Sequence, residues 1–144
     1  MTVKPTTASC ARLSDIAGES GGASREAERK LKAERAEAAN EEFKALVDAV
    51  AETTREDYAA VLPCFLELAR PSLQEALQQL EHQPVDTVYV YPLFFNNGKH
   101  VATDIPAQVE EARERHPHLT IELLEYFGTA PGLASLVREH IAGQ

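Results

Sequence analysis

Two spacings of hydrophobic residues alternate along this chain, and together they predict a succession of helices and strands. The run Val88–Phe95 is almost continuously apolar and rich in β-branched and aromatic residues, which is typical of an interior strand covered on both faces of a parallel sheet. Similar runs at Tyr58–Glu67 and Thr120–Phe127 predict two more strands. Pro63 works against the first of these because it removes one ladder hydrogen bond.

Helix-forming residues fill the segments between the apolar runs. Residues from Ser24 to about Thr53 are mostly Ala, Glu, Lys and Arg, with no Pro or Gly, and predict one long helix. Pro71 opens a second helix, Asp104 is a common N-cap residue before a third that begins near Ile105, and a fourth follows Gly128. This alternating order predicts an α/β fold, a parallel sheet flanked by helices on both faces.

The composition divides the chain into a tail and one domain. Residues 1–23 are rich in Thr, Ser, Gly and Ala and offer too little apolar surface to offset the entropy of ordering, so we expect a disordered tail. Residues 24–144 are expected to form a single domain. Apolar residues at helical spacing begin only at Phe43 within the long helix. We therefore expect the folded core to span about 36–144.

Charge and cysteine content exclude several classes of function. The chain has 144 residues and a formal net charge of -9, which argues against nucleic acid and anionic membranes as partners because both require a basic face. Its apolar runs are shorter than the ~20 residues of a membrane span. Cys10 and Cys64 do not make a disulfide framework. Residues 1 to about 22 lack an apolar signal core and a basic start, so we expect no export signal. We expect a cytoplasmic protein.

A polar loop directly after the central strand carries the candidate chemistry. Asn96-Asn97-Gly98-Lys99 leads from that strand into His100. In open α/β sheets, ligands collect outside the carboxyl ends of the strands. Right-handed connections between parallel strands would bring Glu67, His100 and Phe127 to the same rim of the sheet. A loop histidine without any role is the alternative interpretation.

Four motifs follow one another along the chain. They are Phe65-Leu-Glu-Leu-Ala-Arg-Pro-Ser-Leu73, Tyr91-Pro-Leu-Phe-Phe, Gly98-Lys-His-Val-Ala-Thr-Asp-Ile-Pro106 and Gly128-Thr-Ala-Pro131. In this order they resemble the small class II chelatases, the single-domain sirohydrochlorin cobaltochelatases and ferrochelatases of the CbiX and SirB type. The resemblance covers Ala39 to the C-terminus.

The resemblance implies a function and a site. Members insert a divalent metal into a sirohydrochlorin-type tetrapyrrole in cobalamin or siroheme biosynthesis, without an organic cofactor, and pair as homodimers. The metal, here Co²⁺, Fe²⁺ or Ni²⁺, is itself a substrate. By the family pattern, Glu67 and His100 are the metal ligands and catalytic residues. Lys99, Asn97 and Gly98 are candidate contacts to the tetrapyrrole.

One family motif has no counterpart here. The family begins with an apolar strand that runs into Gly-His-Gly-Ser-Arg, whose histidine is a further metal ligand. This chain keeps the helix motif Glu37-Ala-Ala-Asn40-Glu-Glu-Phe43, but Lys30-Leu-Lys-Ala-Glu-Arg35 stands upstream of it, without strand or histidine. Either the lineage has lost the first strand and its motif, or a wrong start or a frameshift has replaced them in this sequence.

Three functions therefore remain open from the sequence. The first is a tetrapyrrole chelatase. The second is a degenerate relative that binds metal or tetrapyrrole through Glu67 and His100 without turnover. The third is a dimerisation module built on the long helix, although Ser24 to Ala39 lacks the heptad repeat that a coiled coil requires.

Overall fold

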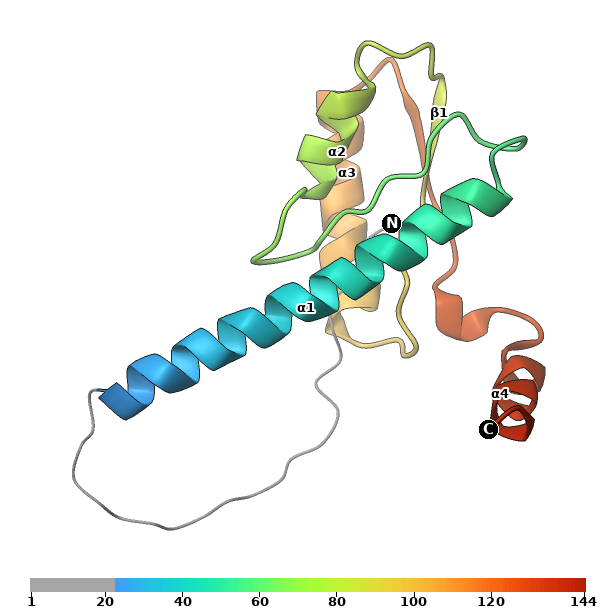
Figure 1. Ribbon diagram of the computed structural model, residues 1–144. Helices are drawn as coiled ribbons and strands as arrows, with labels where there is room; N and C mark the ends of the chain where they lie inside the picture. Colours follow the sequence, from blue (N-terminus) through green and yellow to red (C-terminus); the bar gives the residue numbers. More distant parts are fainter. Residues whose placement is uncertain (1–22) are drawn as a thin grey trace.

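The computed structural model describes residues 23–144, so the predicted disordered tail lies outside the described residues except for Ala23. Four α-helices, two strands and two short helical turns follow one another along the chain (Figure 1). In order they are α1 (Ala23–Thr53), α2 (Leu73–Leu80), β1 (Thr87–Val90), the π-helical turn η1 (His100–Asp104), α3 (Ile105–Arg115), β2 (Thr120–Leu123), the 3₁₀ turn η2 (Phe127–Thr129) and α4 (Leu133–Ala142).

β1 and β2 form a two-stranded parallel sheet in which Val88 is opposite Ile121. Bonds from the Thr120 N–H to the Asp86 carbonyl and from the Leu124 N–H to the Val90 carbonyl, both 2.9 Å, extend the pairing beyond the ends of the strands. The helix α3 connects the strands, as parallel pairing requires. The predicted α/β class with a parallel sheet is confirmed.

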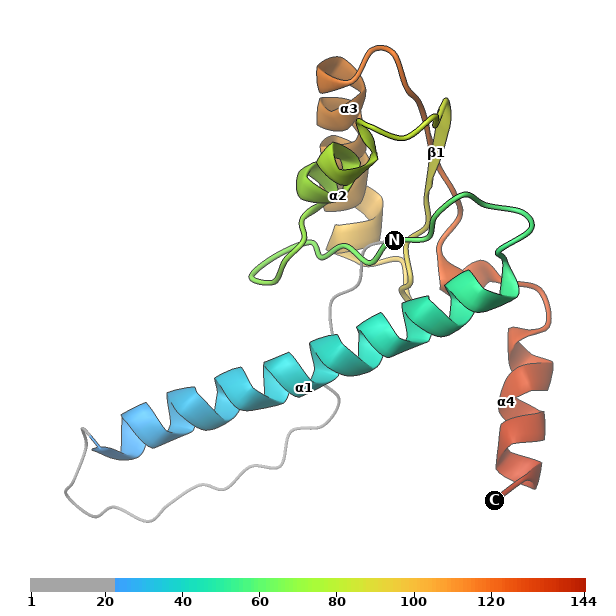
Figure 2. The same cartoon turned by 45° about the horizontal axis from the view of Figure 1, so that its top comes forward.

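Helices cover the sheet region from two sides, and each side has its own cluster of buried residues. On one side, α2 and α3 pack on the two strands through residues such as Leu77, Val109 and Val90. On the other side, the second half of α1 packs Phe43 and Val47 against Phe65, and the two phenyl rings meet edge to face with 5.4 Å between their centroids. The N-terminal half of α1 projects from this body, as Figures 1 and 2 both show.

The predicted strand at Tyr58–Glu67 is wrong. Residues 58–63 have no regular secondary structure, and within the predicted strand only Cys64 forms an isolated β-bridge. Pro63 contributes to this because it cannot donate to a ladder. The larger reason is that a strand exists only where a neighbour pairs with its backbone groups, and β1 pairs with β2 instead.

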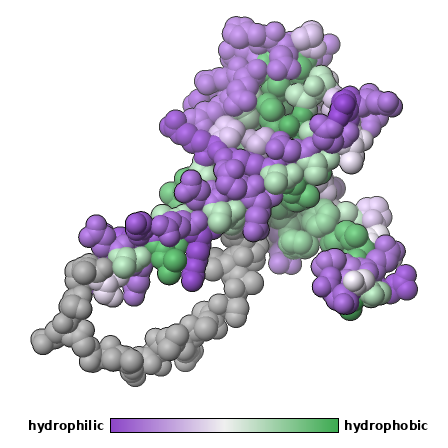
Figure 3. Space-filling model, in the orientation of Figure 1, coloured by the Kyte–Doolittle hydropathy of each residue, from purple (hydrophilic) through white to green (hydrophobic). Residues whose placement is uncertain are grey.

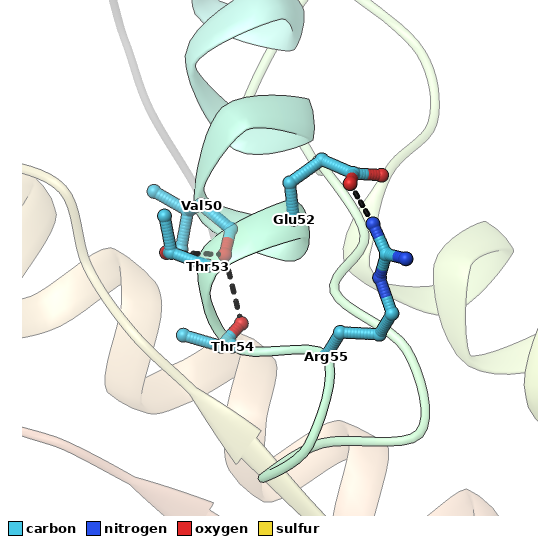
Figure 4. A network of polar contacts seen from close by, with 5 residues as sticks. All are labelled: Val50, Glu52, Thr53, Thr54 and Arg55. Atoms are coloured by element: carbon cyan, nitrogen blue, oxygen red, sulfur yellow. Dashed lines mark hydrogen bonds and ion pairs between the residues drawn. The ribbon is translucent and has the colours of Figure 1, made fainter.

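The long helix α1 ends as the sequence predicts, and Figure 4 shows the polar contacts at its last turn. The hydroxyl groups of Thr53 and Thr54 both donate to the Val50 carbonyl, at 2.8 and 2.9 Å. Arg55 pairs with Glu52 across the end of the helix. Threonine hydroxyls that bond back to the preceding turn compete with further helix, which stops α1 before the extended segment.

The helix α4 keeps its apolar stripe but buries none of it. Leu136, Val137 and Ile141 are 56%, 50% and 68% exposed, and no residue of α4 is buried. The stripe that sequence periodicity places on one face is therefore an exposed surface in this structure.

At Gly128, the backbone of the turn η2 contacts the segment that precedes His100. Its N–H donates to the Phe94 carbonyl at 2.9 Å, and the rings of Phe95 and Phe127 pack with centroids 5.3 Å apart. A Cβ at Gly128 would lie 2.0 Å from the Phe95 carbonyl oxygen. Backbone approaches this closely only because glycine has no side chain.

We expect Gly128→Ala to destabilise the fold by about 1–3 kcal/mol, because the methyl group forces two backbone segments apart. Urea unfolding followed by circular dichroism measures the change. Gly98→Ala is the matched control, since a Cβ there meets nothing within 4 Å, and its unfolding midpoint should stay close to that of the parent. Equal midpoints for Gly128→Ala and the parent would contradict this account.

Candidate metal centre

Glu67 stands at the turn between the extended segment and α2. The Ala69 N–H donates to the Glu67 carbonyl at 2.7 Å, across a turn centred on Leu68. Leu68 has a φ of 59°, in the left-handed region that costs a non-glycine residue about 1–2 kcal/mol. Its side chain is fully exposed. This unusual turn fixes the direction in which the Glu67 side chain leaves the backbone.

His100 lies in a helical turn, where the sequence predicted a loop. The π-helical turn η1 runs from His100 to Asp104 and continues into α3 at Ile105. Asp104 makes no capping hydrogen bond; its carboxylate Oδ2 lies 2.8 Å from Nδ1 of His100 instead. The helix begins where expected, but the predicted cap residue has a different partner.

The hydrogen bond from His100 to Asp104 determines which ring nitrogen can bind a metal. A carboxylate accepts a hydrogen bond, so Nδ1 carries the proton and the lone pair of the neutral ring lies on Nε2. The side chains of His100 and Asp104 are each 25% exposed. Metal-binding histidines commonly have their second nitrogen held in this way by a carboxylate.

The structure brings Glu67 to this pair from a distant part of the sequence. One potential ligand atom from each of Glu67, His100 and Asp104 lies within 4.8 Å of the others. Two ligands bound to one ion at ~2.1 Å are at most about 4.2 Å apart. Small side-chain rotations would therefore allow Glu67 and His100 to bind one ion, while Asp104 stays hydrogen-bonded to Nδ1 of His100. Two carboxylates and a neutral imidazole would balance the charge of a divalent ion.

Aromatic rings lie close to this cluster. The ring of Phe94 is 6.1 Å from that of His100, centroid to centroid, and Phe95 remains 63% exposed next to Phe127. Burial also raises the pKa of the Tyr91 phenol, close by in the sequence, above its ordinary value, which is already well above 7, so this phenol is neutral at pH 7. The cluster is thus an acidic and imidazole site beside an apolar aromatic surface.

The structure brings some of the predicted site residues together and leaves others apart. Glu67 and His100 come together at one rim as expected, and Phe127 reaches the same region through Phe95. Asn97, Gly98 and Lys99 are exposed on the segment that leads into His100, and their contacts to a tetrapyrrole stay predictions. The other four histidines of the chain do not join the cluster within residues 23–144.

Sequence reasoning missed Asp104 as a member of the cluster. A signal was available, because His100 and Asp104 are four residues apart and that spacing places two side chains on one face of a helix. The sequence predicts a loop at His100, however, and in a loop this spacing has no geometric meaning.

Among the helices of residues 23–144, none combines the length and the apolar character needed to cross a membrane.

Comparison with known proteins identifies a family and several similar sequences. The sequence profile of the family described as CbiX matches residues 34–144. A sirohydrochlorin cobaltochelatase from Sulfurisphaera tokodaii is 35% identical over 77 residues, which are 54% of this chain and 61% of that protein. A sirohydrochlorin ferrochelatase from Priestia megaterium is 28% identical over 78 residues, 54% of this chain and 29% of that protein. These matches span less than two thirds of the relatives' own length.

Two solved structures have a fold similar to that of this chain. A cobalamin (vitamin B12) biosynthesis CbiX protein from Marinobacter aquaeolei superposes with a TM-score of 0.59 at 30% identity, covering 71% of this chain and 82% of that one. SirB from Bacillus subtilis, solved with Fe³⁺, superposes with a TM-score of 0.56 at 19% identity, covering 71% of this chain and 41% of that one. At that identity the second likeness concerns the fold alone.

Proposed function

The chain belongs to the CbiX family, and on that premise we propose that it inserts a divalent metal, Co²⁺ or Fe²⁺, into a sirohydrochlorin-type tetrapyrrole. Ni²⁺ is a third candidate metal, because imidazole and carboxylate ligands do not separate these ions. The activity would be that of a chelatase, a lyase of cobalamin or siroheme biosynthesis. The names of the similar proteins support this choice of reaction.

The observation that carries the proposal is the cluster of Glu67, His100 and Asp104. We assign Nε2 of His100 and the carboxylate of Glu67 as the metal ligands, and Asp104 as the residue that positions the imidazole. A site with only two or three protein ligands leaves coordination positions open, and the metal must have open positions if it is to be passed on. Weak binding suits an ion that is a substrate.

The reaction needs proton acceptors as well as metal ligands. Insertion of M²⁺ into the free macrocycle releases two pyrrole N–H protons, so the overall charge balances when two protons leave. Glu67 is exposed, and its carboxylate can accept a proton once the metal has moved to the macrocycle nitrogens. His100 can do the same through Nε2. Both groups would therefore serve first as ligands and then as bases.

The proposed substrate is a polycarboxylate, and the chain carries a formal net charge of -9. The net charge of the protein repels such a substrate, so individual positively charged or hydrogen-bonding groups at the site must attract it. Lys99 is exposed directly before His100, and we propose that it pairs with a substrate carboxylate, with Asn97 and Gly98 contacting the macrocycle from the same segment. The exposed Phe95 offers an apolar surface for the flat ring.

We further propose that the protein works as a cytoplasmic homodimer. Glu67 and Leu68 are exposed at the rim, so one copy covers only part of a macrocycle. A second copy facing this rim would enclose the substrate and exclude water.

The test is a spectrophotometric assay of the purified chain with sirohydrochlorin under anaerobic conditions, with Co²⁺, Fe²⁺ or Ni²⁺ added in turn. We expect the absorption spectrum to change to that of the metallated product at a rate proportional to protein concentration. Rates equal to the protein-free reaction with all three metals would contradict the proposal. Metal binding by calorimetry without turnover would then identify a non-catalytic relative.

A further inference from the structure

The helices α2 and α3 both end where the chain turns into a strand. Residues 81–86 connect α2 to β1, and residues 116–119 connect α3 to β2. Thr87 lies opposite Thr120 in the parallel sheet, and the Thr120 N–H donates to the Asp86 carbonyl at 2.9 Å. This pairing places the two connections, and with them the C-terminal ends of the two helices, side by side at the top of Figure 1.

His116 is the C-cap residue of α3, and its side chain is only 9% exposed. A buried imidazole is costly unless its nitrogen atoms find partners, yet its ring makes no hydrogen bond to another residue among 23–144. Oε1 of Glu81, the C-cap residue of α2, lies 3.9 Å from its Nδ1. That distance is too long for a hydrogen bond, but two ligands of one ion, each bound at ~2.1 Å, lie up to about 4.2 Å apart. The gap between the two atoms therefore has the width that a shared metal ion requires.

A second imidazole lies beside the first. The ring centroids of His116 and His118 are 6.0 Å apart, and two imidazoles that bind one ion at ~2.1 Å have centroids about 5–6.5 Å apart. The Leu119 N–H donates to the His116 carbonyl at 2.9 Å, so a tight turn keeps the two histidines close together. His118 is exposed, and rotation of its side chain would bring a ring nitrogen to the atoms of Glu81 and His116 that face each other.

The electrostatic surroundings of these three side chains favour a cation. Both α2 and α3 direct their C-terminal ends to this place, and a helix C-terminus carries a partial negative charge. The basic side chains in the last turn of α3, Arg113 and Arg115, are paired with Glu110 and Glu111, so together these four add no net charge. Hydrophilic residues cover this end of the molecule at the top of Figure 3, where ions can approach from solvent.

We propose that Glu81, His116 and His118 form a second site, which binds a divalent transition metal such as Zn²⁺. Two neutral imidazoles and one carboxylate are ligands that this class of ion prefers. The bound ion would link the end of α2 to the end of α3 and so stabilise the folded state. The site is separate from the proposed metal centre, because His100 precedes α3 and His116 follows it, about 20 Å away along the helix at a rise of about 1.5 Å per residue.

The experiment uses the full chain with Glu67→Ala and His100→Ala, which together remove the proposed metal centre. We expect titration calorimetry to show that this double variant binds one Zn²⁺ per chain. Adding His118→Ala or Glu81→Gln should weaken binding at least about tenfold, since even a residue that only orients a metal ligand contributes that much. Adding His140→Ala is the control, because His140 is exposed on α4, and it should leave the affinity unchanged. No Zn²⁺ binding by the double variant, or an unchanged affinity after either His118→Ala or Glu81→Gln, would overturn the proposal.

Urea unfolding of the same double variant tests the link between the two helices. With free Zn²⁺ at 100 times its Kd, we expect the equilibrium constant for unfolding to fall about 100-fold, and adding His118→Ala should remove most of this effect. The ring signals of His116 and His118 in NMR spectra should shift with Zn²⁺, whereas those of His140 should not. Stability that does not respond to Zn²⁺, or shifts confined to His140, would overturn the proposal. Neither measurement involves a tetrapyrrole, so this site and the proposed chelatase activity succeed or fail independently.

Discussion

His100→Ala is expected to lower the rate of metal insertion into sirohydrochlorin by at least about 100-fold, because it removes a proposed metal ligand that is also a proposed proton acceptor. The half-buried imidazole has its Nδ1 held 2.8 Å from the Asp104 carboxylate, so in the proposed site its Nε2 would bind the metal. Titration calorimetry with Co²⁺ should show loss of the main binding site in the same variant.

Two further variants make this first prediction specific. Glu67→Ala should cause a loss of the same order, and the double variant should be little worse than either single one, since ligands of one ion act as a unit. His82→Ala is the control, because His82 is exposed and does not belong to the cluster. Full activity in both His100→Ala and Glu67→Ala would show that the reaction takes place elsewhere.

Asp104→Ala is expected to weaken Co²⁺ binding by about 10–100-fold, the effect typical of removing a carboxylate that orients a metal-binding histidine. The imidazole would then be free to rotate and to exchange its proton between the two nitrogens. Calorimetry at constant pH measures the affinity, and the chemical shifts of the His100 ring report which nitrogen carries the proton.

The conservative variant Asp104→Asn separates the two roles that this carboxylate can have. Its amide oxygen still accepts a hydrogen bond from Nδ1 of His100, so a positioning role predicts a smaller loss than in Asp104→Ala. If the two variants bound Co²⁺ equally weakly, the negative charge itself would be required. Positioning through the hydrogen bond alone would then be wrong as the role of Asp104.

The sequence alone determined the local elements of this protein. The Ala, Glu, Lys and Arg composition of residues 24–53 predicted α1, and the apolar runs at Val88 and Thr120 located β1 and β2. Helix propensity and apolar periodicity act between residues close in the chain, so one sequence is sufficient to read them. The motifs around Glu67 and His100 likewise indicated the family.

Only the tertiary structure decided which extended segments are strands and which side chains share a site. Tyr58–Glu67 has a strand-like sequence but forms only an isolated β-bridge at Cys64, because a strand depends on a neighbour that this segment's own residues cannot supply. The turn at Leu68 brings Glu67 close to His100, and the helical turn η1 places Asp104 against the imidazole. These contacts join residues distant in sequence or depend on an exact backbone turn, and neither follows from local preference.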